Sequence, residues 1–190
     1  MKRLLLTGMC MLWLSYNIGA QAFVRAGMVT FQPNVDEVIL NVTTRSFPSY
    51  YIGGGLEAKI LKIFLLEIGA NYYDINVDVE SGSATEKLDG AMVGLPVLLK
   101  INPVKYFNAG VGLMPSTFIN SNTLENLYYK KYNVSGTAKI EVKPIRQISI
   151  ELAYTLGFIP SEVVWRDSQG AEEILKSNQS FYNLGLKYNF

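Results

Sequence analysis

The chain has 190 residues, of which 49% are hydrophobic and 17% charged, with one cysteine and no histidine. Its 17 basic and 16 acidic residues nearly cancel, which argues against nucleic acid as a partner because such partners select a basic surface. Hydrolases and acyl transferases usually need a histidine base, and zinc sites without His or Cys are rare. The composition therefore predicts no enzyme, no metal site and no cofactor.

The first 22 residues have the pattern of a cleaved secretory signal peptide. Lys2 and Arg3 precede an apolar run over residues 4–14, and the small-x-small triplet AQA at 20–22 predicts cleavage before Phe23. The apolar run is too short and too interrupted to anchor the chain in a bilayer as a helix. The sequence thus divides into a signal peptide, 1–22, and one mature domain, 23–190.

Removal of the signal peptide changes what can hold the mature chain together. The only cysteine, Cys10, is lost, so an exported domain would fold without disulfides. Loss of two cations lowers the 17 basic residues to 15 against 16 acidic ones, for a net charge near −1. No later apolar run reaches the roughly 18 residues that a membrane-spanning helix needs.

The mature sequence alternates between apolar and polar residues with a period of two, which is typical of β-strands. One such stretch, QISIELAYTLGF, covers residues 147–158. The predicted strands, in chain order, are 23–31, 49–60, 64–74, 88–101, 105–117, 132–143, 147–158 and 180–190.

The connections between these stretches are short and long in turn. Three are tight, at 61–63, 102–104 and 144–146, and four are long and polar, at 32–48, 75–87, 118–131 and 159–179. This order predicts an all-β fold, an eight-stranded antiparallel up-and-down transmembrane β-barrel whose two rims face different surroundings. Strands of about 10 residues match the height of the apolar band of an outer membrane.

The last strand, SFYNLGLKYNF, places a large apolar or aromatic residue at every second position up to the final residue. It resembles the C-terminal signature of outer-membrane β-barrels, which the barrel insertion machinery reads. The residues of this insertion signal, expected to face lipid, are Tyr182, Leu184, Leu186, Tyr188 and Phe190. Aromatic residues at strand ends predict two girdles at the membrane surfaces, with Tyr50, Tyr72, Phe107, Phe158, Tyr188 and Phe190 as members.

The architecture resembles that of small eight-stranded outer-membrane barrels of the OmpA/OmpX size. More narrowly, GLPVLLK at 94–100 followed by NAGVG at 108–112 is similar to a strand pair in PorT-type outer-membrane barrel domains. A proline before an apolar run and a lysine is common in that group, so Pro96 is expected to mark a bulge in its strand. Pro115 is expected to lie above the membrane band. The resemblance implies fold and location and assigns no activity.

Nine charged residues are predicted to point into the barrel: Arg25, Glu57, Lys59, Glu67, Lys100, Lys139, Glu141, Glu151 and Lys187. An eight-stranded barrel is only wide enough inside for side chains, and buried charges must pair. We therefore expect a packed core of ion pairs, with a narrow gated ion path as the alternative. The first strand is ambiguous, because Phe23, Val29 and Phe31 share the side of Arg25.

The long connections are the candidates for contact with partners. Asp74, Asp78, Glu80 and Glu86 flank the second one, which we interpret as a solvated acidic loop in preference to a calcium site.

The predicted role is structural or in surface interactions, in the outer membrane of a Gram-negative bacterium with both termini in the periplasm. Expected partners are membrane lipid, lipopolysaccharide, the insertion machinery, and an envelope or surface protein bound through 32–48 and 159–179. A small channel and an exported soluble ligand-binding barrel remain as alternatives.

Overall fold

The computed structural model describes residues 20–35, 42–81, 84–121, 127–129, 132–158, 161–166 and 172–190. Most of the predicted signal peptide therefore lies outside the described residues. The strands are β1 (Ala20–Val35), β2 (Val42–Ser46), β3 (Pro48–Lys59), β4 (Phe64–Ser81), β5 (Ala84–Gly94), β6 (Val97–Val104), β7 (Phe107–Ser121), β8 (Leu127–Tyr129), β9 (Tyr132–Ile145), β10 (Ile148–Gly157), β11 (Ser161–Arg166) and β12 (Glu172–Asn189). Within this part of the chain, no helix is long and apolar enough to cross a membrane.

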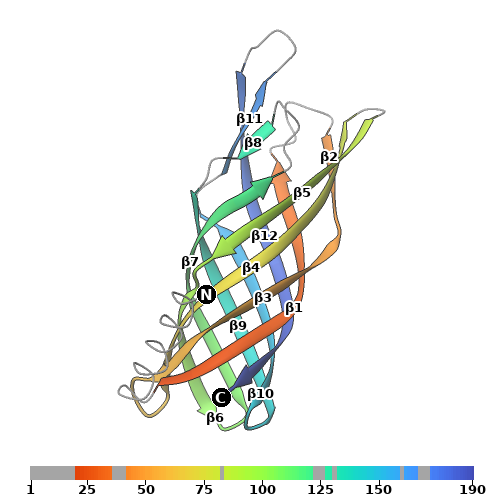
Figure 1. The fold of residues 1–190 in the computed structure, drawn as a ribbon. Coiled ribbons are helices and arrows are strands. Elements are labelled where there is room, and N and C mark those ends of the chain that lie inside the picture. The colour runs from red at the N-terminus through yellow and green to blue at the C-terminus, as the bar shows by residue number, and fades with distance from the viewer. Residues whose placement is uncertain are drawn as a thin grey trace, which may run out of the picture.

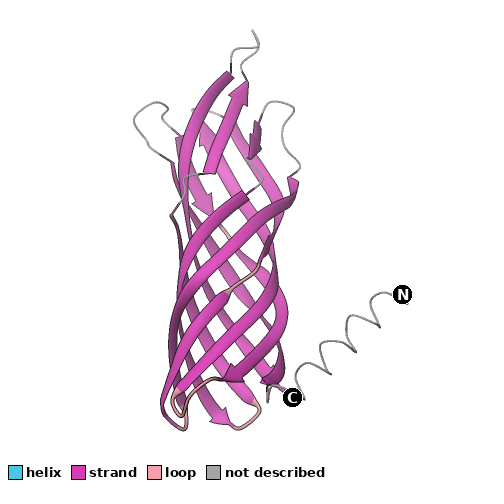
Figure 2. Ribbon diagram, turned by 90° about the vertical axis from the view of Figure 1, so that its left-hand side faces the viewer, coloured by secondary structure: helices cyan, strands magenta, loops and turns pink. Residues whose placement is uncertain are grey.

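The strands form one antiparallel sheet that closes on itself. Its order is β1-β3-β4-β5-β7-β9-β10-β12, and β12 pairs back onto β1 (Figures 1 and 2). Strand β6 lies between the same neighbours as β5, β4 and β7, so the two occupy one position in the ring. The described residues thus form a closed eight-stranded barrel, and the predicted fold is confirmed.

The first and the last strand, β1 and β12, meet where the barrel closes. Phe23 lies opposite Asn189, and the Phe190 N–H donates a hydrogen bond of 3.0 Å to the carbonyl of Ala22. Pairing with β3 already begins at Ala20, three residues before the predicted cleavage point. That cleavage point stays a prediction, while the terminal strand is part of the barrel wall to its last paired residue.

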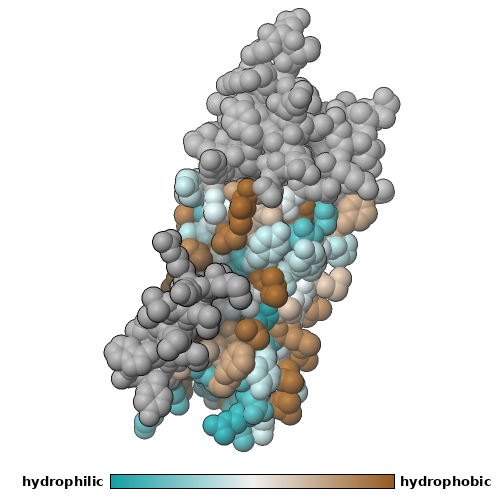
Figure 3. Space-filling model, viewed as in Figure 1, coloured by the Kyte–Doolittle hydropathy of each residue, from teal (hydrophilic) through white to brown (hydrophobic). Residues whose placement is uncertain are grey.

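Alternation along the strands puts apolar side chains outside and polar ones inside. In β10, Leu152 is 45% exposed on the outer surface, whereas its neighbour Glu151 is 3% exposed inside the barrel. The residues expected to form the insertion signal, such as Leu184 and Phe190, point outward in the same way. Figure 3 shows the resulting hydrophobic side chains over the flank of the barrel. This is the reverse of a water-soluble protein, in which the apolar side chains are buried.

Pro96 and Pro115 share a single interruption of the sheet. Strand β5 ends at Gly94 and β6 begins at Val97, so the expected bulge at Pro96 is a break between two strands. The carbonyl of Pro115 accepts the Leu95 N–H at 2.8 Å. Because the N–H and C=O of a strand residue face the same neighbour, the missing N–H of Pro115 also faces this break. The barrel wall therefore accommodates both prolines at one place.

The strands next to the long connections are longer than predicted. Strand β4 continues to Ser81 and pairs there with β2 and β5, and β12 begins at Glu172 and pairs with β11. The predicted loops 32–48, 75–87, 118–131 and 159–179 are therefore partly strand, and their predicted bounds were wrong. The extension of β12, EEILKSNQ at 172–179, does not alternate with a period of two, whereas INVDVE at 75–80 in β4 does alternate, although the sequence prediction placed it in a loop.

Candidate functional site: the interior of the barrel

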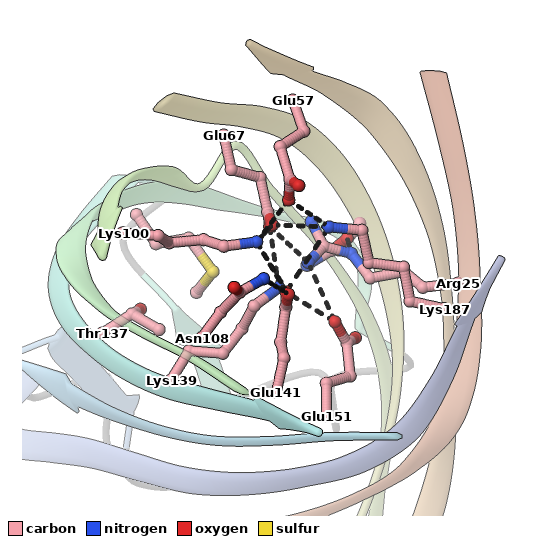
Figure 4. Close-up of polar contacts among 12 residues, drawn as sticks. Arg25, Glu57, Glu67, Lys100, Asn108, Thr137, Lys139, Glu141, Glu151 and Lys187 are labelled. Carbon is pink, nitrogen blue, oxygen red and sulfur yellow. Dashed lines mark hydrogen bonds and ion pairs between the residues drawn. The ribbon is translucent and has the colours of Figure 1, made fainter. Parts of the chain in front are cut away.

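One charge network fills the end of the barrel that carries the short turns. Arg25, Glu57, Glu67, Lys100, Lys139, Glu141, Glu151 and Lys187 all lie inside, and each is at most 5% exposed. They come from six strands around the ring, β1, β3, β4, β6, β9 and β10, and from the last strand, β12. Figure 4 shows their charged groups converging on the barrel axis.

Glu67 is the centre of this network. Its Oε1 atom accepts hydrogen bonds of 2.8 Å from Arg25 Nη1 and from Lys139 Nζ. Its Oε2 atom accepts from Lys100 Nζ at 2.9 Å and from Lys187 Nζ at 3.0 Å. Four cations thus bind one carboxylate that is 0% exposed. A buried carboxylate is stable only with such compensation, because its hydration is lost completely.

The other three carboxylates complete the charge balance. Lys100 Nζ donates to Glu57 and, at 2.8 Å, to Glu141. Lys187 Nζ donates to Glu57 at 2.7 Å. Lys139 also forms an ion pair of 2.9 Å with Glu151. Four glutamates and four basic residues give the network a net charge of zero, which is the condition for burying so many ions together.

Lys59 is the one predicted interior residue that lies elsewhere. It is the last residue of β3, and its side chain is exposed at the mouth of the barrel. Lys143, which was not predicted, lies 3.6 Å from Glu57 Oε1 with 16% of its side chain exposed. Position along the strand explains both. A side chain that points inward is buried in the middle of the barrel, but near a strand end it reaches the mouth and is exposed to solvent.

An apolar layer fills the interior beyond the charges, toward the long connections. Its members are Val29, Phe31, Tyr51, Tyr73, Met92, Met114 and Phe181, each at most 4% exposed. Tyr51 and Tyr73 stack with ring centres 5.8 Å apart, and Phe181 lies 5.3 Å from Tyr73 and 4.9 Å from Phe31. The expectation of an interior plugged by charged side chains therefore omitted this apolar layer.

Polar side chains join the two layers. The Tyr51 hydroxyl donates a hydrogen bond of 2.7 Å to Glu151 Oε1. Arg25 Nε donates to Asn71 Oδ1 at 2.8 Å, and Asn71 Nδ2 donates to the Tyr73 hydroxyl at 2.7 Å. Each tyrosine thus contributes its ring to the apolar layer and its hydroxyl to the charged one.

Close packing at this junction depends on a glycine. A Cβ atom at Gly185 would lie 2.2 Å from the Tyr51 hydroxyl, so any larger residue there would displace the ring. The hollow left between the layers, lined by Arg25, Tyr51 and Asn183 among others, measures about 10 Å³. That is about the space of one water molecule, too small for an organic ligand.

The glutamates of the network have the spacing of metal ligands, but their oxygen atoms already accept hydrogen bonds from lysines. One oxygen each of Glu57, Glu67 and Glu141 lies within 4.8 Å of the others. Lys100 and Lys187 place their ammonium groups within 3.4 Å of all three carboxylates. These ammonium groups supply the positive charge that a metal ion would bring, so the geometry suits mutual neutralisation of side chains.

No protein-family model and no curated protein sequence matches the chain. Solved structures do match: the outer membrane protein OprG from Pseudomonas aeruginosa has a TM-score of 0.60 at 15% identity, covering 90% of this chain and 96% of OprG. Neisserial surface protein A has a TM-score of 0.55 at 8% identity, covering 90% of this chain and 99% of its own. These similarities establish the fold that the chain shares with small outer-membrane β-barrels.

Proposed function

We propose that the chain is a bacterial outer-membrane barrel with a structural or surface-interaction role and a sealed interior. The observation that carries the proposal is the inverted surface: the ions lie inside, and the outer face of the strands is apolar. Val24, Ile68, Val111, Ile140 and Leu186 lie on different strands around the ring, and each is at least 43% exposed. Water would disfavour such a belt, whereas lipid stabilises it.

The same observations disfavour an exported soluble binding barrel. Such a barrel would need a polar outer face and an internal cavity of several hundred cubic ångströms for its ligand. Between the two interior layers of the described structure, the hollow measures only about 10 Å³. As a soluble protein, this barrel would expose its apolar outer face to water and would have no room for a ligand between its interior layers.

We further propose that the termini and the short turns face the periplasm. The long connections would then face outward, where they contact lipopolysaccharide or an envelope or surface protein through 32–48 and 159–179. Within those segments the structure describes β2 and β11, which extend the barrel wall away from the short turns (Figure 1). Kinship with PorT-type barrels is part of the proposal and rests on GLPVLLK at 94–100 and NAGVG at 108–112.

Replacing Phe190 by aspartate is expected to reduce outer-membrane assembly strongly, because it puts a charge on the terminal aromatic residue of the predicted insertion signal. Phe190 is 69% exposed, so the change removes little packing within the barrel. The measurement is the amount of folded protein in isolated outer membranes. Tyr132→Asp is the control. Tyr132 is 79% exposed at the opposite end of the barrel, so this change should reduce assembly far less. Normal levels of the Phe190→Asp protein would contradict the insertion signal.

Two measurements test the sealed membrane barrel. Extracted from membranes in detergent, the protein should migrate faster on a gel before boiling than after it, as closed membrane barrels do. Purified and placed in planar bilayers, it should show no steady conductance, because the charged and the apolar layer both block the axis. A reproducible conductance step whose ion preference shifts in Glu67→Gln or Lys139→Gln would overturn the sealed interior in favour of a channel.

A further inference from the structure

The rim of the barrel that carries the short turns has ionic side chains of one sign. Its exposed or half-buried ionic side chains are Lys59, Lys62, Lys105, Lys143 and Arg146, and the part of the chain that the structure describes adds no exposed acidic side chain there. The glutamates nearest to this rim belong to the neutral network inside. Excess positive charge at one rim attracts anions, and more strongly where the surface is concave.

Three of these lysines line a hollow at the mouth of the barrel. This mouth pocket measures about 250 Å³ and is bounded by Lys59, Lys62 and Lys143, with Asn102 and the buried Glu57 beside them. Gln21 also lines it in this structure, but it precedes the predicted cleavage point and would be absent from the mature protein. The end of β3 and the turn after it contribute Lys59 and Lys62, and the end of β9 contributes Lys143, so three ammonium groups surround one space of the size of a small polyanion.

Glu57 does not neutralise the mouth pocket. Its Oε2 atom already accepts hydrogen bonds from Lys100 and from Lys187, the latter at 2.7 Å, and both lysines belong to the interior network. Only Lys143 approaches its other oxygen, at 3.6 Å. Within the described residues Lys59 and Lys62 form no ion pair, so their charges remain available to a ligand.

We propose that the mouth pocket binds a phosphate-type oxyanion. Ammonium groups bind phosphate as point charges, and three that converge on one hollow compensate a group with two or more negative charges. The source of the phosphate is either a soluble anion or the headgroup of an anionic lipid in the adjoining leaflet. The groups remain partly hydrated at the mouth, so binding weakens as salt screens the charges.

Isothermal titration of the mature protein with pyrophosphate, in a non-ionic detergent and a low-salt, phosphate-free buffer, tests the soluble source. Saturable binding of one anion per barrel is expected. The double variant Lys59→Gln/Lys62→Gln should bind about tenfold more weakly, as expected for the loss of two partly exposed ion pairs. The matched control is Lys105→Gln/Arg146→Gln, which removes the same charge from the same rim outside the mouth pocket and should bind as the parent does.

Native mass spectrometry of barrels taken from bilayers that mix phosphatidylcholine with phosphatidylglycerol tests the lipid source. Retention of phosphatidylglycerol by the parent and the control, its loss from the pocket variant, and its displacement by pyrophosphate would identify the headgroup as the ligand. Unchanged gel migration checks that all variants are folded. Equal weakening in both double variants would reduce the effect to diffuse rim charge and overturn the pocket. Absence of binding in both experiments would overturn it as well.

Discussion

Replacement of Glu67 by glutamine is expected to lower the free energy of unfolding by about 3–5 kcal/mol, the usual cost of leaving a buried charge without its partner. Four cations donate to Glu67, and each of them is at most 4% exposed. Glutamine keeps the shape but replaces one oxygen with an NH₂ group that faces ammonium groups. Denaturant unfolding of the barrel in phospholipid vesicles, followed by gel migration, measures the loss.

A second replacement distinguishes loss of charge balance from loss of shape. In Glu67→Gln/Lys139→Gln the interior is neutral again, because one negative and one positive charge are lost together. The two side chains are direct partners, with Lys139 Nζ 2.8 Å from Glu67 Oε1. The double variant should therefore cost less than the sum of the two single changes. Lys105→Gln, at an exposed turn, serves as the control with no expected effect. Strict additivity of the two interior changes would contradict a coupled network.

Leu152→Arg is expected to cost about 2–4 kcal/mol of folding stability in a lipid bilayer, the range for an arginine on the lipid face near the midplane. Leu152 lies in the middle of β10 and points outward between Ile150 and Tyr154. Equilibrium unfolding in bilayers of defined composition measures the cost.

The control for this prediction is Phe158→Arg. Phe158 is also outward and 60% exposed, but it follows the last residue of β10 and would lie at the membrane surface. The cost of an arginine falls to about 0–1 kcal/mol near that surface. Equal costs at the two positions, or none at either, would mean that this face of the barrel does not contact lipid.

Much of the barrel could be predicted because a lipid-facing wall imposes alternation on the sequence. Glu151 and Leu152 are adjacent in the chain and lie on opposite faces, as the period of two requires. The same parity brings Arg25, Glu67 and Lys187 into one interior. The extension of β12 could not be predicted in this way, because EEILKSNQ at 172–179 lacks the alternation and is held by backbone pairing with β11. The extension of β4 carries the alternation in INVDVE at 75–80 and could have been predicted.

The aromatic layer inside the barrel was not predicted from the alternation, for another reason. Large apolar residues in a membrane barrel normally face lipid, so Tyr51, Tyr73 and Phe181 carry no local mark of an interior position. Parity with charged residues on the same strand would have identified them. Tyr51 lies six residues before Glu57, and Phe181 six residues before Lys187, both even separations that place the pair on one face.

Closure of the barrel by its first and last strands has a consequence for how the chain folds. Arg25 is on β1 and Lys187 on β12, so the network takes its first member from one end of the chain and its last from the other. Before β12 docks, four glutamates face only three cations, and charge neutrality is reached at the moment of closure. Contacts so distant in sequence form slowly. Docking of the final strand therefore completes both the charge balance and the sheet. A barrel in which β12 has not docked retains an uncompensated negative charge inside and two open sheet edges.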